Sequence, residues 1–414
     1  PRSFDPHGGE LSLELAPSLA ASMLNALQAL ENFPYACTEQ TLSRFLPNLE
    51  TYRVLQQFGI SAETLKSRLD RTLQEGLTQL VSRQNSDGGW GWWQGRQSDP
   101  YITAYILFGL ARAQQAGVAV ESVVMQRAIE YLLASSPAPK MLSETWQLDR
   151  LAFAYFALAQ AAEPSALDLG IPAALFEVRQ LLSPWAQALL ALTFDKLSPQ
   201  DARIATLLSE LQTSAIRSAS GAHWEDSQPS WSNMSTPIYT SAVVLYALAQ
   251  HDPASPLVAE AVRYLMAHRQ VGGWNSTYET AWTLMALTEV MRGTGELGGD
   301  FDFTAMLNGT PLAEGKASGT SQLTPVTATQ PIDKLYSEAP NALLIQRTQG
   351  VGRLYYTARL KVYQPVEMVA PIQRGFTVQR AYYPAGQDCT PSKCQPIHSA
   401  RAGDLVMVRL TIMV

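Results

Sequence analysis

Hydrophobic and polar residues follow a helical period over most of the chain, from about Ser18 to about Met291. Within this region an eight-residue pattern recurs, in which the second and seventh residues are small, the fifth is apolar and the eighth is leucine. The pattern occurs at residues 20–27, 103–110, 151–158, 185–192, 241–248 and 280–287. Because these segments are apolar nearly all the way round, each is predicted to be a buried helix. The small residues would let neighbouring helices approach closely.

Longer amphipathic stretches lie between these segments, at 63–82, 121–135 and 200–215, and suit an outer layer. Six inner helices that alternate with outer ones are typical of an (α/α)6 toroid, so the fold class is predicted to be mainly α. Two glycine-rich turns precede inner helices, at Gln84–Trp90 (QNSDGGW) and Gln270–Trp274 (QVGGW). These turns resemble the QW motifs of terpene cyclases, and we expect them to hold successive repeats together.

Segments with strand periodicity flank the helical region. Residues 10–15 alternate polar and apolar, as do Phe301–Phe303, and Asn308-Gly309 is a strong hairpin signal. A single strand cannot fold alone, so the strand at 10–15 is expected to join a sheet formed by residues 300–364. The helices would then be inserted into a small β domain. A further strand at 376–379 indicates a second β domain.

Charge and hydropathy exclude two classes of protein. The formal net charge is −6 and no block of Lys or Arg occurs, which argues against a nucleic-acid partner. No run of about 18 apolar residues is present, so no segment is predicted to span a membrane. The chain begins with Pro1 and ends in an interrupted strand at Leu410–Val414, so we expect a piece of a larger protein. Any membrane association would then depend on parts outside these residues.

The three cysteines fall into a pair and a single residue. Cys389 and Cys394 lie in a turn-rich segment, where they could form a short disulfide loop, remain two thiols, or join His398 in an incomplete metal site. We favour the disulfide, which implies an oxidising compartment. Cys37 stands alone, far from the pair in sequence.

The segment Cys37-Thr38-Glu39-Gln40 has a specific chemical interpretation. A thiolate three residues before a glutamine can reach its side-chain carbonyl if the chain makes one helical turn. Attack there expels ammonia and leaves an acyl-thioester. Cys37 is expected near a helix N-terminus, whose dipole favours thiolate. Glu39 either complements that dipole or takes part in the chemistry. Side chains expected to shield the site from water are Tyr35, Trp90, Trp92 and Trp93.

Other interpretations of these residues remain open. Cys37 could be an inert buried thiol, or the nucleophile of a cysteine hydrolase or transglutaminase, which needs a histidine. No histidine stands in a recognisable Cys–His context; they are His7, His223, His251, His268 and His398. A terpene-cyclase-like enzyme would need an aspartate-rich acid motif, and a zinc-dependent prenyltransferase a ligand set. The sequence shows neither, so no metal and no cofactor are predicted.

Pro34–Gln40, followed by Phe45, Pro47 and Asn48, resembles the thioester region of the α2-macroglobulin and complement family. That pattern is a proline, a Gly-Cys-Gly-Glu-Gln core and then Phe-x-Pro-Asn in the macroglobulins. The flanking glycines are Ala36 and Thr38 here. The segment from Asp87 to Tyr105 resembles the next repeat of that family. The amino-acid sequence of residues 40–48 is more similar to the large bacterial macroglobulins than to the vertebrate ones.

This resemblance implies a domain order over the whole chain. Residues 1–16 would be the first part of a CUB-like β-sandwich domain and residues 17–297 the α/α toroid of a thioester domain. Residues 298–368 would complete the CUB-like domain, and residues 369–414 would begin a macroglobulin or receptor-binding-type β domain.

The resemblance also implies a function, in which Cys37 is the thiol leaving group and Gln40 the acyl donor. The protein would be a broad-spectrum protease inhibitor in host defence that traps proteases outside the cytoplasm, in the periplasm, at the cell envelope or after secretion. Residues 118–162 lack the histidine with which many complement proteins redirect the thioester towards hydroxyls. The thioester should therefore prefer amines, such as protease lysines. Each thioester is consumed once, so the protein would not be an enzyme. The alternative is an interaction scaffold in which no thioester forms.

Overall fold

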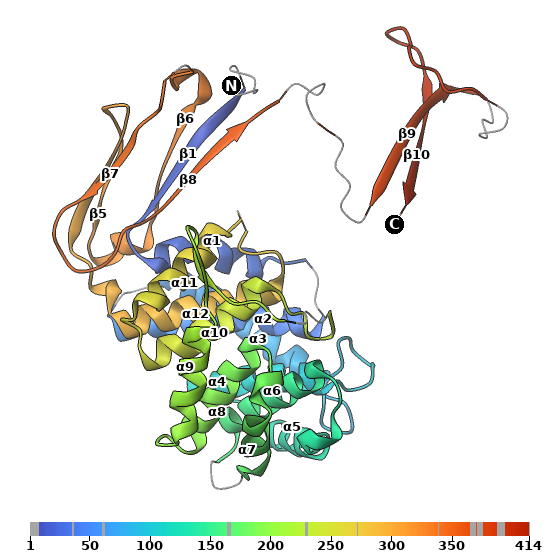
Figure 1. Cartoon of the computed structure of the whole chain (residues 1–414), viewed down its shortest axis with the longest axis vertical. Coiled ribbons are helices and arrows are strands. Elements are labelled where there is room, and N and C mark those ends of the chain that lie inside the picture. Colours follow the sequence, from blue (N-terminus) through green and yellow to red (C-terminus); the bar gives the residue numbers. More distant parts are fainter. Residues whose placement is uncertain are drawn as a thin grey trace. The chain divides into compact units, whose positions relative to one another are not determined.

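The computed structural model of the chain is shown in Figure 1. It describes residues 8–34, 37–59, 63–163, 167–227, 231–270, 272–337, 339–364, 370, 376–386 and 394–413. The chain divides into two compact units, and the larger consists of Leu11–Gln330 with Glu338–Arg359. The α-helices of the described residues are α1 (Leu19–Glu31), α2 (Thr38–Gln57), α3 (Glu63–Ser82), α4 (Pro100–Gln115), α5 (Ser122–Ala134), α6 (Thr145–Ala161), α7 (Gly170–Glu177), α8 (Pro184–Leu197), α9 (Ala202–Thr213), α10 (Pro237–His251), α11 (Pro256–Ala267) and α12 (Thr277–Thr294).

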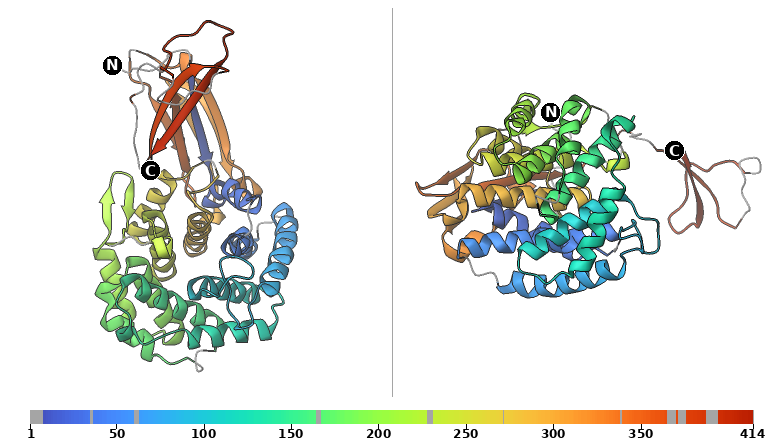
Figure 2. Two further views of the ribbon diagram at one scale, coloured as in Figure 1. Left: turned by 90° about the vertical axis from the view of Figure 1, so that its right-hand side faces the viewer. Right: turned by 90° about the horizontal axis from the view of Figure 1, so that it is seen from below.

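The even-numbered helices form a closed ring. Each of α2, α4, α6, α8, α10 and α12 contacts the next, and α12 contacts α2 to complete the circle. The odd-numbered helices each pack against one or two ring helices, and the left view of Figure 2 shows the circular arrangement. The predicted (α/α)6 toroid is therefore confirmed.

The centre of the ring is filled with aromatic side chains. Phe108 of α4 stacks on Trp282 of α12 with ring centroids 5.6 Å apart, and Phe153 and Trp185 add further ring contacts. Small residues allow the helices to come this close, as the repeated pattern predicts. A Cβ on Gly109 of α4 would lie only 2.3 Å from a methyl carbon of Leu42 in α2.

One ring helix differs from the repeated pattern. The segment at 20–27 lies in α1, which packs against α12 and α2, and α2 itself takes the place in the ring between α12 and α4. The apolar pattern misses α2 because this helix buries Glu39, Ser43 and Thr51 beside its leucines. Those polar groups are tolerated because partners on α2 itself, α4 and α12 satisfy their hydrogen bonds.

Tryptophans join outer helices to the ring helices that follow them. Three indole N–H groups donate to carbonyls in the last turn of an outer helix: Trp90 to Leu80 (2.7 Å), Trp224 to Leu211 (2.7 Å) and Trp274 to Leu265 (2.9 Å). Their main-chain N–H groups donate to hydroxyls of the next ring helix, those of Thr103, Ser241 and Thr280. The predicted role of the two glycine-rich turns is confirmed. The third junction, at Trp224, lacks the paired glycines that mark the other two.

The strands that flank the helices pair with one another. Two three-stranded sheets have the orders β6-β1-β8 and β5-β4-β7. Their strands are β1 (Gly9–Ala16), β4 (Phe301–Leu307), β5 (Thr310–Ala317), β6 (Val326–Pro331), β7 (Leu343–Arg347) and β8 (Tyr355–Val362). The strand before the helices thus joins a sheet with strands that follow them, as predicted. Asn308 and Gly309 both have positive φ and form the tight turn of the predicted hairpin β4–β5.

Two two-stranded sheets complete the described strands. β2 (Ile216–Ser218) pairs with β3 (Gly221–His223) beside the third tryptophan junction. β9 (Thr377–Pro384) pairs with β10 (Val406–Met413) in an antiparallel sheet, which includes the strand predicted at 376–379. The domain boundaries drawn from the family resemblance stay predictions.

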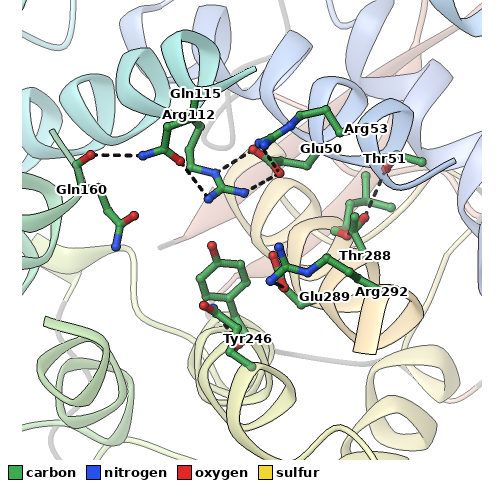
Figure 3. Close-up of polar contacts among 12 residues, drawn as sticks. Glu50, Thr51, Arg53, Arg112, Gln115, Gln160, Tyr246, Thr288, Glu289 and Arg292 are labelled. Carbon is green, nitrogen blue, oxygen red and sulfur yellow. Dashed lines mark hydrogen bonds and ion pairs between the residues drawn. The ribbon is translucent and has the colours of Figure 1, made fainter. Parts of the chain in front are cut away.

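Charged side chains lie close to the C-terminal ends of the ring helices α4 and α12, and one ion pair joins α4 to α2 (Figure 3). Arg112 of α4 donates two hydrogen bonds to the carboxylate of Glu50 in α2, at 2.7 and 2.6 Å. Arg292 pairs with Glu289 on α12. Cations at these positions also complement the partial negative charge of the helix ends.

Candidate functional site

Cys37 and Gln40 are brought together by the start of α2. Cys37 is the N-cap residue, and its sulfur accepts a hydrogen bond from the main-chain N–H of Gln40 at 3.4 Å. In return, Oε1 of Gln40 accepts from the main-chain N–H of Cys37 at 3.2 Å. This reciprocal capping box turns the glutamine side chain back over the cysteine. The thiol and the side-chain amide therefore both lie at the first turn of α2, each bonded to the main chain of the other residue.

The thiol of Cys37 is buried, with 6% of the residue exposed. Burial raises the pKa of this thiol above its ordinary value, although the hydrogen bond from Gln40 acts in the opposite direction. The main-chain N–H groups at the helix N-terminus favour thiolate at Cys37, as expected, but burial outweighs them and the net change in the pKa is upward. Because burial disfavours the thiolate, attack by the sulfur would be helped by a base that takes the thiol proton.

Glu39 is a buried carboxyl group at the same helix start. Only 4% of the residue is exposed, and Oε1 accepts a hydrogen bond from Ser43 at 2.6 Å. Thr277 of α12 donates to Oε2 at 2.9 Å, and the thiol of Cys37 lies 3.9 Å from the same oxygen. Burial raises the pKa of Glu39, with the hydroxyl hydrogen bonds acting against it. This environment is that of an internal carboxyl group, not of a solvated helix-cap charge.

The turn before α4 covers the start of α2. Thr38 donates its main-chain N–H to the carbonyl of Trp92 at 3.0 Å and its hydroxyl to the carbonyl of Gly91 at 2.7 Å. Trp90 is fully buried, whereas 56% of Trp93 is exposed. The main chain of this turn therefore covers the first turn of α2. Shielding by the side chains of Trp90 and Trp92 stays a prediction, and the indole of Trp92 lies 3.3 Å from a carboxylate oxygen of Asp99. Tyr35, the other predicted shielding residue, lies outside the described residues.

Sequence reasoning missed three residues of this site. Ser43 lies one turn after Glu39, a spacing that could have identified it, and its hydroxyl also contacts that of Tyr105 at 3.0 Å. Tyr105 belongs to α4. Thr277 comes 238 residues after Glu39 and carries no local signal, because it reaches the site only when α12 closes the ring against α2.

The other predicted residues that the structure describes form no contact with Cys37 or Gln40. Cys389 lies outside the described residues, so the disulfide between Cys389 and Cys394 stays a prediction. His223 contacts Glu225 and stacks on Tyr264, away from Cys37. Across the part of the chain that the structure describes, no cluster of three or more potential metal ligands occurs.

Comparisons with known proteins agree on one family. The family model described as the A-macroglobulin TED domain matches residues 12–148 and 171–290. Over 390 residues the chain is 25% identical to the alpha-2-macroglobulin of Thermotoga maritima, which covers 90% of this chain and 22% of that protein. The alpha-2-macroglobulin of Xylella fastidiosa is 36% identical over 120 residues, 28% of this chain and 7% of that protein. The chain thus spans only a small part of these relatives.

Solved structures show the same fold. Native alpha-2-macroglobulin from Escherichia coli, from domain MG7 to the C-terminus, has a TM-score of 0.57 at 21% identity. The match covers 99% of this chain and 60% of that chain. Salmonella alpha-2-macroglobulin reacted with methylamine has a TM-score of 0.59 at 19% identity, over 99% of this chain and 25% of that chain.

Proposed function

The chain belongs to the A-macroglobulin TED-domain family, and on this premise we propose that it forms an internal thioester between Cys37 and Gln40. The observation that carries the proposal is the reciprocal capping box, which holds the thiol beside the amide that it would attack. Formation joins Sγ of Cys37 to Cδ of Gln40 and releases the amide nitrogen as ammonia. Thr38, which replaces a glycine of the family pattern, fits the site because it lies in the first turn of α2 and needs no positive φ.

We propose that this thioester captures proteases. In the complete protein, a protease would cut a bait segment elsewhere and the molecule would rearrange to expose the thioester. A lysine amine of the protease would then attack Cδ of Gln40, form an amide and release the thiol of Cys37. Two solved structures of relatives support this role. One is E. coli alpha-2-macroglobulin activated by porcine elastase, and the other is Salmonella alpha-2-macroglobulin reacted with methylamine. The protein would act once per molecule and would not turn over, in line with its family.

A preference for amines over hydroxyls follows from the same site. Within the described residues, no histidine hydrogen-bonds to Cys37 or Gln40, and residues 118–162 contain none. Without an imidazole to form an acyl intermediate, direct attack by the stronger nucleophile should dominate. Glycerol should therefore label the activated protein less than methylamine does.

We place the protein outside the cytoplasm, in the periplasm, at the cell envelope or secreted, because its targets would be foreign proteases in host defence. The predicted disulfide between Cys389 and Cys394 supports an oxidising compartment. None of the described helices has both the length and the apolar character needed to cross a membrane.

Mass spectrometry of the complete polypeptide that the gene encodes tests the proposal. The peptide containing Cys37 and Gln40 should lack the mass of one ammonia, and methylamine should add to Gln40 while freeing one thiol. Gln40→Glu is the matched control, since it keeps the oxygen that caps Cys37 but has no amide nitrogen to expel. A protease with unmodified lysines should form an adduct that survives denaturation, and one with dimethylated lysines should not. If Cys37 of the wild type is freely alkylated and Gln40 is unmodified, the thioester is refuted. The interaction scaffold is then the remaining function.

A further inference from the structure

Glu39 lies where its carboxyl group can accept the proton of the Cys37 thiol. The thiol donates to Oε2 of Glu39, with the sulfur 3.9 Å from that oxygen. The other hydrogen bonds to this carboxyl group come from two neutral hydroxyls, those of Ser43 and Thr277. Within the described residues no lysine or arginine forms an ion pair with Glu39. Burial raises the pKa of Glu39, which brings the proton affinity of the carboxylate closer to that of the thiolate.

We propose that Glu39 is the catalytic acid–base of this site, carrying a proton between the sulfur of Cys37 and the nitrogen that leaves or enters at Gln40. The inference rests on the proposed thioester and adds the group that makes it form and open. A neutral thiol is a poor nucleophile and a thiolate in an apolar site a poor leaving group, so both directions need such a proton carrier.

The proton and the bonds balance in each direction. During formation, the Glu39 carboxylate takes the thiol proton and the sulfur attacks Cδ of Gln40. The C–N bond then breaks, and Glu39 returns the proton to the nitrogen, which leaves as ammonia. When an amine opens the thioester, its nitrogen attacks Cδ and its proton passes to Glu39. The C–S bond then breaks and Glu39 protonates the sulfur of Cys37.

Thr277 is a positioning residue for Glu39. It lies in the first turn of α12, and its hydroxyl donates to Glu39 at the place where α12 closes the ring against α2. A carboxyl group held by Ser43 alone, from its own helix, would be free to turn away from the sulfur. The reactivity of the thioester should therefore depend on the hydroxyl that α12 supplies.

The first experiment compares wild type and Glu39→Gln in the complete polypeptide. Two quantities are measured: the fraction of molecules that have lost ammonia at Gln40, and the rate of thiol release after methylamine is added. Glutamine keeps the size and hydrogen-bonding capacity of the side chain but cannot carry the proton. We expect the rate of opening to fall by about 100-fold or more, or the thioester to fail to form. A fully formed thioester that opens at the wild-type rate would overturn the proposal.

A second set of variants separates positioning from stability. Thr277→Val should slow opening of the thioester about tenfold, because the hydrogen bond from Thr277 to Glu39 is lost. Thr277→Ser keeps the hydroxyl and should open at the wild-type rate. Thr288→Val is the matched control. Thr288 is also buried on α12, and its hydroxyl contacts that of Thr51 on α2 at 3.2 Å, three turns further along the helix. Equal rates in Thr277→Val and Thr288→Val would contradict the positioning role, even if Glu39→Gln misfolds.

The wild type distinguishes failure of this inference from failure of the proposed function. If the wild type shows no loss of ammonia and no response to methylamine, the thioester itself is refuted. If the wild type shows both and the variants at Glu39 and Thr277 behave like it, only the proton transfer by Glu39 is refuted.

Discussion

Replacing Arg112 by methionine should destabilise the helical ring strongly, because it removes the closer and more deeply buried of two cations that pair with the buried carboxylate of Glu50. Arg112 and Glu50 have side chains that are 12% and 8% exposed, and they share two short hydrogen bonds between α4 and α2. After the substitution, Glu50 keeps its ion pair with Arg53 of the same helix, at 3.5 Å, and the Arg53 side chain is 29% exposed. Methionine keeps the aliphatic stem, so the change removes the guanidinium and little packing.

The magnitude follows from the geometry of the pair. Removing one partner of a buried ion pair costs about 3–5 kcal/mol. The remaining attraction to Arg53 puts Arg112→Met at the lower end of this range, about 3 kcal/mol. In a unit as large as Leu11–Gln330 with Glu338–Arg359, 1 kcal/mol lowers the midpoint of thermal unfolding by roughly 1–2 °C, so the midpoint should fall by roughly 4 °C.

Thermal unfolding followed by far-UV circular dichroism measures this effect. The control is Lys66→Met, which breaks an equally short but exposed pair with Asp70 on α3 and should leave the midpoint unchanged. The double variant Arg112→Met with Glu50→Met removes both charges and should recover at least half of the loss. The reasoning is refuted if Lys66→Met is as destabilising as Arg112→Met, or if the double variant unfolds below the single one.

Three further predictions concern the ring. Trp224→Phe removes the indole N–H that donates to the carbonyl of Leu211 and should lower the free energy of unfolding by about 2 kcal/mol, measured by urea denaturation. Gly109→Ala should cost about 1–3 kcal/mol in the same assay, because its Cβ would overlap Leu42 between α4 and α2; a neutral effect would contradict the close approach. Burial raises the pKa of Asp149 to about 7, from an ordinary value of 3.8. Since the folded state favours the protonated form, the contribution of Asp149 is fully present below pH 3.8 and lost as the pH rises towards 7. Asp149→Asn should therefore reduce the fall in the midpoint of thermal unfolding between pH 3.8 and about pH 7. A variant with the same pH profile as the wild type would refute this prediction.

Local patterns explain why much of the fold was predictable. The strongly apolar segments from residue 103 onwards became ring helices, because a helix that is apolar all round has to be buried whatever its neighbours are. Asn308-Gly309 formed its hairpin because both residues adopt positive φ readily. The apolar pattern did not identify α2 as a ring helix. Its buried glutamate, serine and threonines are residue types usually found at the surface, and their partners on other helices cannot be read from the sequence.

The sequence by itself determined the pairing of Cys37 with Gln40, because three residues separate the two and a single turn of helix is enough to bring them together. Only the tertiary structure decided the chemical state of that pair. Burial raises the pKa of the thiol although the helix N-terminus acts to lower it, and the carboxyl group beside it is held partly by Thr277, from the far end of the helical region. Desolvation and long-range hydrogen bonds depend on which helices meet, and this ring is closed only when α12 reaches α2.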